Sequence, residues 1–343
     1  MIEEYDYLDL FAGPGGWDEG LHMLGHRNVI GIEYEKNARD TRAAAGHATI
    51  LEYESNVALM DLLWMTSKYF PRGVRGLIAS PPCQEFSLAG KKGGYDSLRG
   101  QLVFEPVRYV EALEPEWIAL EQVPTVLPAW KHFEDIFRSM GYNTWSGILD
   151  AADYGVPQHR RRAILMASRG RVRPPEPTHG VADHDDLFGA SRAPYVTMAE
   201  ALGWTGHEIV LDSRGDGDPD GEWQRSGSFG TDRPARTLGE KARSWEVVPP
   251  PEDCPAWPYR RPATTVVGSF RPDIMAAPDF RKDPKVPRQK APDSVPITIE
   301  QALILQGFPV NYPIQGARTR QFEQVGNAIP PPLAAAILKE LIC

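Results

Sequence analysis

Short apolar runs that alternate with helix-forming segments restrict the fold of this 343-residue chain more than any other feature. Each run suits one interior strand, and the segments between the runs suit helices. The expected strands are Tyr7–Leu10, Val29–Ile32, Gly76–Ala79, Trp117–Leu120 and Arg162–Ala167. The expected helices lie at about Trp17–Leu24, Lys36–Ala45, Val57–Phe70, Leu102–Leu113 and Phe133–Met140. This alternation predicts an α/β fold with a doubly wound, mostly parallel sheet.

The character of the chain changes after about residue 170. Of the 32 prolines, 23 lie beyond that point, and helical periodicity returns only at Ile299–Gln306 and Pro331–Leu341. We therefore predict a second, smaller and loop-rich domain. The expected division is residues 1–170 as the main domain, 171–295 as the smaller domain and 296–343 as a C-terminal segment that returns to the main domain.

Composition excludes several classes of protein. The net charge is -9, and no apolar run reaches the roughly 18 residues of a membrane span. Because the first residues are acidic, unlike those of a signal peptide, we expect a cytoplasmic protein with no membrane partner. The cysteines at 83, 254 and 343 lack zinc-ligand spacing, and an acidic run at 216–221 lacks the glutamate that completes a calcium loop. We expect no metal.

Cys83 has the most distinctive surroundings of the three cysteines. It follows the expected strand Gly76–Ala79 and comes directly after two prolines, which forbid helix and end the hydrogen bonding of the strand. Ligands bind at the carboxyl ends of strands in open α/β sheets. A glycine-rich loop with Lys91 and Lys92 follows, and a mobile cationic flap of this kind suits a reactive thiolate.

A glycine turn follows the first strand and opens the first helix. It matches neither the dinucleotide fingerprint nor a P-loop, although its glycines still allow a ligand to approach the backbone closely. Glu33 ends the second strand, where its carboxylate can accept hydrogen bonds from both ribose hydroxyls of a nucleoside. Phe11 and Tyr34 are placed to hold an adenine between them. The pattern therefore favours a nucleoside cofactor.

Two further polar groups come at or near the ends of expected strands. Glu121 follows Trp117–Leu120, which should lie beside the strand that leads to Cys83, and a buried carboxyl group there can donate a proton near neutral pH. Arg160 and Arg162 are two residues apart, so on a strand they face the same way. They can hold the carboxylate and a base. The alternative for Glu121 is a capping or salt-bridged role.

Together these motifs resemble, in the same order, those of the DNA (cytosine-5) methyltransferase family. They cover roughly residues 7–167 and 298–341, and residues 171–295 fall where the family carries its variable target-recognition domain. There are three departures from the family pattern: Gln122 replaces the commoner asparagine, Asp18 stands where serine is frequent, and residues 51–54 lack the usual aspartate near the adenine. The matching stretches are Asp9–Gly16, Pro81–Ser87, Glu121–Val123, Gln158–Arg162, Gln306–Pro309 and Gly326–Pro331.

The resemblance implies a sheet of the S-adenosylmethionine-dependent methyltransferase type and methyl transfer from that cofactor to C5 of a cytosine flipped out of double-stranded DNA. It implies that Cys83 adds to cytosine C6, that Glu121 stabilises charge at N3, that Arg162 helps hold the base and that Arg160 orients Glu121. The expected cofactor contacts are Phe11, Gly13, Gly15, Gly16, Glu33, Tyr34 and Asn327. The expected DNA contacts are Ser87, Lys91, Lys92 and Gln158.

We further expect a monomer, and the sequence leaves open whether a cognate restriction endonuclease exists. Three alternatives for the function also stay open. An RNA cytosine-5 methyltransferase would carry much the same motifs, although the Cys-Phe-Thr signature of the transfer-RNA branch does not occur in this sequence. A catalytically inactive DNA-binding homologue would not need intact Cys83 and Glu121. A redox thiol enzyme would need a resolving cysteine near Cys83, and the next cysteine is Cys254.

Overall fold

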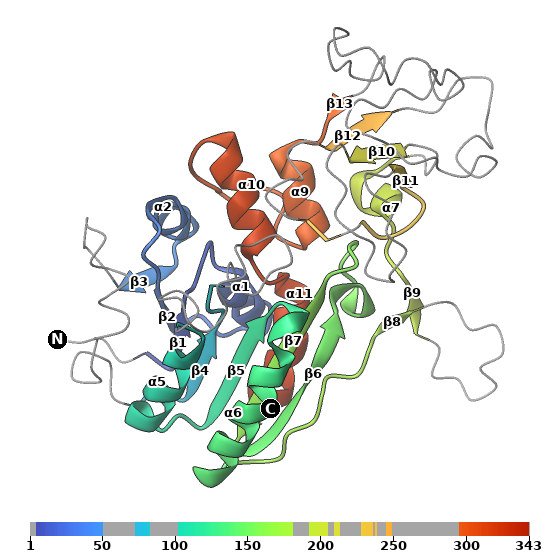
Figure 1. The fold of residues 1–343 in the computed structure, drawn as a ribbon. Coiled ribbons are helices and arrows are strands. Elements are labelled where there is room, and N and C mark those ends of the chain that lie inside the picture. Colours follow the sequence, from blue (N-terminus) through green and yellow to red (C-terminus); the bar gives the residue numbers. More distant parts are fainter. Residues whose placement is uncertain are drawn as a thin grey trace, which may run out of the picture.

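The computed structural model describes residues 5–50, 73–82, 102–180, 192–204, 209–212, 228–235, 237–238, 245–248 and 295–342. Within them, seven strands form one sheet in the order β3-β2-β1-β4-β5-β7-β6 (Figure 1). β1 to β5 pair in parallel, and β7 is antiparallel to both of its neighbours, β5 and β6. The predicted doubly wound, mostly parallel sheet is confirmed. The strands are β1 (Tyr7–Leu10), β2 (Val29–Ile32), β3 (Ala48–Ile50), β4 (Gly76–Ala79), β5 (Trp117–Gln122), β6 (Asn143–Asp150) and β7 (Arg161–Ser168).

Helices cover both faces of this sheet. Successive strand residues point to opposite sides, so apolar strands present apolar side chains on both faces, and helices bury them. Leu8 and Leu10 of β1 belong to a core with α5 (Glu105–Leu113) and α6 (Leu127–Ser139), which lie in front of the sheet in Figure 1. Tyr7 belongs to the opposite core, with α1 (Gly16–Met23) and α11 (Pro331–Ile342). The C-terminal helix thus packs against the first helix of the chain.

Local sequence explains most of these elements. α2 (Lys36–Ala45) begins where predicted, and the Glu35 carboxylate caps it by accepting a hydrogen bond from the backbone N–H of Ala38 at 2.8 Å. The helix expected from Phe133 instead begins at Leu127, since Pro128 is tolerated in a first turn. The segment expected as one helix from Leu102 divides into a 3-10 turn, Leu102–Phe104, and α5. Two more 3-10 turns are Pro124–Val126 and Ala151–Tyr154. The helix expected at 57–70 lies outside the described residues.

A second, antiparallel sheet lies beyond the end of the first (Figure 1), and its described strands follow the order β11-β10-β12-β13. β13 contains both residues 295 and 296, so the predicted boundary at that point crosses a strand, and the three-part division of the chain stays a prediction. No described helix is long and apolar enough to cross a membrane. The elements are β10 (Ile209–Asp212), β11 (Ser228–Gly230), β12 (Trp245–Val248) and β13 (Val295–Pro296), with a parallel pair β8 (His179–Gly180) and β9 (Ala193–Pro194).

Three helices connect this region with the rest of the molecule: α7 (Met198–Leu202), α9 (Ile299–Gln306) and α10 (Arg318–Asn327). They share a hydrophobic core to which Ala235 and Leu238 contribute. α9 begins with a capping box in which Thr298 and Gln301 exchange side-chain and backbone hydrogen bonds. The segment around residue 235 therefore packs on the C-terminal helices.

Candidate active site

The carboxyl ends of β1, β2, β4 and β5 border one continuous cavity. Glu33 and Tyr34 line one end of it, and Pro82, Glu121 and Arg162 line the other. In open α/β sheets, ligands bind at the carboxyl ends of the strands. The residues predicted for the nucleoside site and those predicted for the catalytic site that the structure describes line one cavity at this edge. Asn327, at the last position of α10, also lines this cavity.

The glycine turn brings the backbone unusually close to this cavity. Phe11 adopts φ 60°, a left-handed conformation rare for a residue with a side chain, and Gly13 adopts φ 54°. A Cβ on Gly16 would lie 2.4 Å from the carbonyl oxygen of Ile329, so only glycine lets α1 begin here. Of the three predicted glycines, Gly13 and Gly16 line the cavity, whereas a Cβ on Gly15 would meet the ring of His47 at 2.7 Å.

Glu33 directly follows β2, and two backbone amides hold its carboxylate. Its Oε2 accepts a hydrogen bond from the backbone N–H of Gly13 at 2.8 Å, and its Oε1 accepts one from Glu35 at 2.7 Å. Burial raises the pKa of Glu33, and these two amide hydrogen bonds oppose that rise. The carboxylate is therefore held in one orientation, beside the exposed ring of Tyr34.

The chain that leads to Cys83 is fixed on two sides. The Trp17 indole N–H donates to the Ser80 hydroxyl at 2.9 Å, and the Gln122 side-chain amide donates to the Pro81 carbonyl. Sequence reasoning did not single out Trp17, nor did it give Gln122 a role. The signal available for Gln122 was its place inside the Glu121–Val123 motif. Cys83 itself, with Ser87, Lys91 and Lys92, lies outside the described residues.

Glu121 is 4% exposed and forms an ion pair with Arg162, whose Nε lies 2.8 Å from its Oε1. The strand register explains the pair. Glu121 is opposite Ile164 in the antiparallel β5–β7 ladder, so Arg162 is its diagonal neighbour on the same face, within reach of a long side chain. Arg162 also donates from Nη1 to the carbonyl of Arg161 at 2.8 Å.

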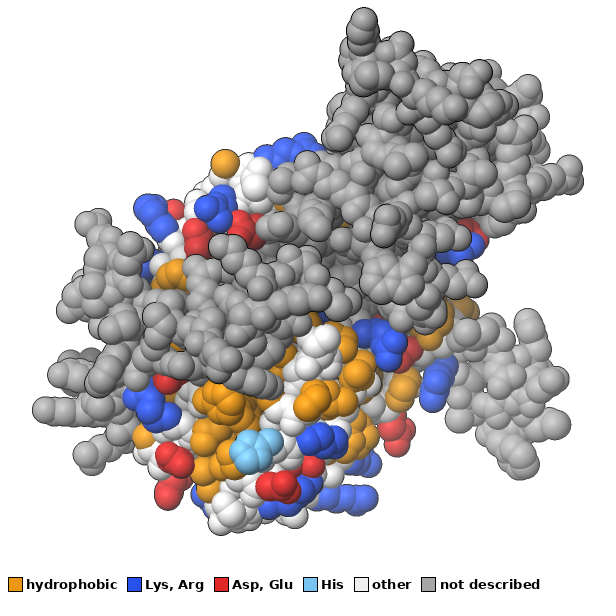
Figure 2. Space-filling model, viewed as in Figure 1, with side chains coloured by type: hydrophobic (Ala, Val, Ile, Leu, Met, Phe, Trp, Pro, Cys, Tyr) orange, Lys and Arg blue, Asp and Glu red, His pale blue; other side chains and the backbone are white. Residues whose placement is uncertain are grey.

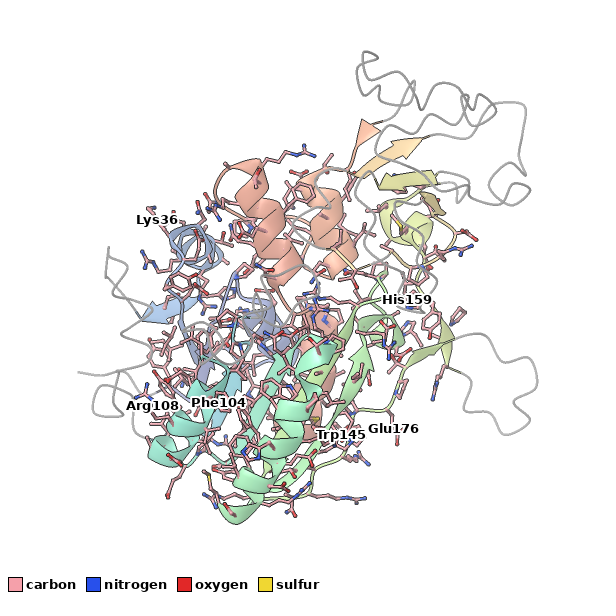
Figure 3. The ribbon with its side chains drawn as sticks, in the orientation of Figure 1. Lys36, Phe104, Arg108, Trp145, His159 and Glu176 are labelled. Carbon is pink, nitrogen blue, oxygen red and sulfur yellow. The ribbon has the colours of Figure 1, made fainter. Side chains whose placement is uncertain are left out.

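Arg160 and Gln158 both contact the segment around Leu238. β7 begins at Arg161, so Arg160 precedes the strand, and its Nη1 donates to the Leu238 carbonyl at 3.0 Å. The ion-pair partner that the structure shows for Glu121 is Arg162, and Arg160 lines the same cavity. The expectation that Arg160 orients Glu121 stays a prediction. The neighbouring His159, labelled in Figure 3, lies between the main sheet and the smaller one.

Gln158 is fully buried, and its side-chain amide is hydrogen-bonded to other groups of the protein. Its Nε2 donates to the Leu305 carbonyl at 3.2 Å and to Gln306 Oε1 at 2.7 Å, while its Oε1 accepts from the N–H of Leu238 at 2.6 Å. In this arrangement Gln158 presents no surface to DNA. It joins α9 to the segment around Leu238.

A buried charge cluster under the glycine turn was also missed. Arg42 makes two hydrogen bonds to Asp18, at 2.7 and 2.9 Å, and both side chains are fully buried. Burial and the neighbouring Asp18 carboxylate raise the pKa of Asp9 well above its ordinary value. Burial also acts to raise the pKa of Asp18, but Arg42, His47 and His22 together outweigh it and lower that pKa. Asp18 and Arg42 are far apart in sequence, and no periodic pattern links them.

Comparison with known proteins gives one consistent family. Residues 5–186 and 242–343 match the family model described as C-5 cytosine-specific DNA methylase. The Type II methyltransferase M.AquIA of Picosynechococcus is 32% identical over 219 residues, which cover 58% of this chain and 88% of that protein. The Type II methyltransferase M1.HphI of Haemophilus parahaemolyticus is 28% identical over 352 residues, which cover 98% of this chain and 86% of that protein.

Solved structures share the fold over the whole chain at low sequence identity. The Dnmt2 methyltransferase of S. pombe superposes with a TM-score of 0.59 at 16% identity and covers 99% of this chain and 98% of its own. The methyltransferase EhMeth of Entamoeba histolytica gives 0.58 at 14% identity, with the same coverage. At these identities the likeness concerns the fold.

Proposed function

Because the chain belongs to the C-5 cytosine-specific DNA methylase family, we propose that it transfers the methyl group of S-adenosylmethionine to C5 of cytosine in a specific sequence of double-stranded DNA. The proposal adds three features to the family assignment: the cofactor, a covalent adduct with Cys83, and a target base flipped out of the duplex.

One continuous cavity joins the two groups of residues that this reaction needs. Glu33 and Tyr34, which suit a nucleoside, and Glu121 and Arg162, which suit a polar base, line the same space. A methyl donor and its acceptor must lie side by side for direct transfer. A cavity with one end for each partner satisfies that requirement.

The Glu33 end of the cavity fits the cofactor. Each oxygen of the Glu33 carboxylate accepts one backbone amide, which leaves lone pairs for the two ribose hydroxyls. Tyr34, which is 39% exposed beside it, and Phe11 offer aromatic surfaces for the adenine, and Asn327 offers an amide from α10. When bound, S-adenosylmethionine supplies an electrophilic methyl group on a sulfonium centre.

The other end of the cavity fits the base. Cytosine C5 is too electron-poor to react unaided, and addition of the Cys83 thiolate to C6 makes C5 an enamine-like nucleophile. Glu121, held by Arg162, stabilises the charge that develops at N3. Once C5 carries the methyl group, its proton is lost and Cys83 is expelled, which restores the aromatic base and the free thiol. Pro81 and Pro82, directly before Cys83 in the chain, line the cavity and support this placement.

The remaining residues are assigned by position and charge. Ser87, Lys91 and Lys92 would contact DNA phosphates, and residues 171–295 would recognise the target sequence. Arg160 and Gln158 would fix the segment around Leu238 against the catalytic part. The described surface over α5 and α6 mixes apolar side chains with charges of both signs (Figure 2), so this face is a poor match for a phosphate backbone. We further propose that the enzyme is a monomer and that a restriction endonuclease recognises the same sequence.

The test is to incubate the purified protein with methyl-labelled S-adenosylmethionine and mixed-sequence duplex DNA, with RNA in a parallel reaction. Bisulfite sequencing then maps the methylated cytosines. We expect label in DNA, at C5, in one short recurring sequence. Label in RNA alone would move the assignment to an RNA cytosine-5 methyltransferase. Bound cofactor without label in either would indicate an inactive homologue.

A further inference from the structure

A cluster of potential metal ligands lies behind the glycine turn. Glu19 and His22 are one helical turn apart on α1, and His47 follows α2. The Oε1 atom of Glu19 is 3.4 Å from Nδ1 of His22 and 3.3 Å from Nε2 of His47. We infer that Glu19, His22 and His47 bind one divalent transition-metal ion, with zinc the best match to this ligand set.

The separations suit tetrahedral coordination. Zinc binds histidine nitrogen and carboxylate oxygen at about 2.0–2.2 Å, so neighbouring ligand atoms around it are roughly 3.4 Å apart. Two of the three separations in the cluster already have this value, and all three ligand atoms lie within 4.8 Å of one another. Two histidines and one glutamate also form a common protein ligand set for zinc with an open fourth position.

The surroundings of His47 favour metal coordination through Nε2. The His47 side chain is fully buried, and its Nδ1 has no hydrogen-bond partner. That atom lies 3.8 Å from the Asp18 carboxylate, which Arg42 holds in place. An imidazole that coordinates a metal through Nε2 carries its proton on Nδ1, and an outer carboxylate commonly orients such a ring. The buried nitrogen would then have a function and an electrostatic partner.

The cluster also has a route from solvent. The side chains of Glu19 and His22 are 16% and 15% exposed, whereas that of His47 is completely enclosed. An ion can therefore enter from the side of α1 and meet His47 last. The sequence signal is the Glu19–His22 spacing, because residues three apart on a helix lie on one face. Cysteine spacing, on which the sequence argument against a metal rested, does not detect such a site.

The ion would lie next to the wall of the cofactor cavity. His47 Nε2 is 3.0 Å from the Tyr312 hydroxyl, and that hydroxyl donates its one hydrogen to the carbonyl of Pro14, which lines the cavity. Without metal, Nε2–H therefore donates to this hydroxyl, and coordination at Nε2 would replace that hydrogen bond and move the ring proton to Nδ1. A Cβ atom added to Gly15 would lie 2.7 Å from the His47 ring, so this ring packs directly against the glycine turn. A bound metal would hold the His47 ring against the glycine turn. Because the metal would bind the folded state, we expect it to raise the thermal midpoint of unfolding.

The test uses the full-length, tag-free protein after treatment with a chelator. Cobalt(II) titration is followed by the visible absorbance of tetrahedral cobalt, and zinc titration by calorimetry. We expect one equivalent of each metal to bind. In Glu19→Gln and in His22→Gln the affinity should fall more than about 100-fold, since loss of an outer partner alone costs about 10–100-fold. Both positions are partly exposed, so either variant can carry the test if the other fails to fold.

His132→Gln is the matched control, because His132 is exposed on α6. It should bind both metals as the wild type does and show the same zinc-dependent rise in thermal midpoint. Equal cobalt spectra in the wild type and in both ligand variants would overturn the inference, as would absence of binding at micromolar metal. A band lost in Cys83→Ser but kept in Glu19→Gln would place the ion on the thiolate and would also overturn it.

Discussion

The Nε atom of Arg162 lies 2.8 Å from Oε1 of Glu121, across neighbouring antiparallel strands and on the same face of the main sheet. The pair is held by strand register, not by a loop. It places a buried carboxylate, fixed in orientation, at the end of the cavity that the two prolines before Cys83 also line. This is the arrangement expected of a group that stabilises charge on a bound base.

Replacement of Glu121 should therefore impair chemistry more than cofactor binding. For Glu121→Gln we expect kcat to fall about 10²–10⁴-fold, the usual contribution of a positioned acid or base, with the cofactor Kd almost unchanged. Glu116→Gln is the control, since Glu116 is exposed and pairs with Arg75. Single-turnover methylation and cofactor titration measure the two effects. A kcat close to that of the control would remove Glu121 from the mechanism.

Arg162→Lys keeps the charge but cannot reproduce the planar contacts of Arg162 with Glu121 and with the Arg161 carbonyl. We expect kcat to fall at least about tenfold, because Glu121 loses its fixed orientation. Arg161→Lys, at the exposed neighbouring position, should behave as the wild type does. Similar kcat values for the two variants would show that the Glu121–Arg162 pair has no part in catalysis.

The buried Asp18–Arg42 pair should dominate the stability of the N-terminal region. Arg42→Met leaves the Asp18 carboxylate buried without its partner, which typically costs about 3–5 kcal/mol. Lys36→Met on the same helix removes an exposed ion pair with Asp40 and should cost less than about 1 kcal/mol. Urea denaturation gives both values. The double variant Asp18→Asn/Arg42→Met should recover part of the loss, and no recovery would argue against the pair as the cause.

Asp9 should make stability depend on pH in the direction opposite to most carboxylates. Its pKa is raised in the folded protein by burial and by Asp18, so the protonated form is favoured there. The stabilisation that protonated Asp9 gives the folded protein is complete below 3.8, the ordinary pKa of an aspartate. It is lost as the pH rises through the higher pKa of Asp9 in the folded state, at up to about 1.4 kcal/mol per pH unit.

Asp9→Asn removes this titration, so its stability relative to the wild type should increase with pH. Urea denaturation of both proteins at a series of pH values above 4 measures the difference. Asp135→Asn, at an exposed position on α6, should show no such trend. A difference between Asp9→Asn and the wild type that stays constant across the series would show that the folded-state pKa of Asp9 is not raised.

The sequence predicted those parts of the fold that local pattern determines. Apolar runs locate β1, β2 and β4, and the rule that strand ends collect ligands locates Glu33 and Glu121. β6 was missed because most of its residues are only half-buried, and α10 was missed because it is largely polar. The pairing of Glu121 with Arg162 needs the antiparallel register, and the Asp18–Arg42 pair needs the position of α2 relative to α1. Neither is a local property of the sequence.

In the proposed mechanism, Cys83 attacks a cytosine held beside Glu121. The most direct measurement uses a duplex with the mapped target sequence and 5-fluorocytosine at the target position. Fluorine replaces the C5 proton whose loss releases the enzyme, so methylated product should stay bound to Cys83. Intact-mass analysis and peptide mapping should find one DNA adduct, on Cys83, only when S-adenosylmethionine is present, and none with Cys83→Ser. An adduct on another residue, or methylation of unmodified DNA by Cys83→Ser at the wild-type rate, would contradict nucleophilic attack by Cys83.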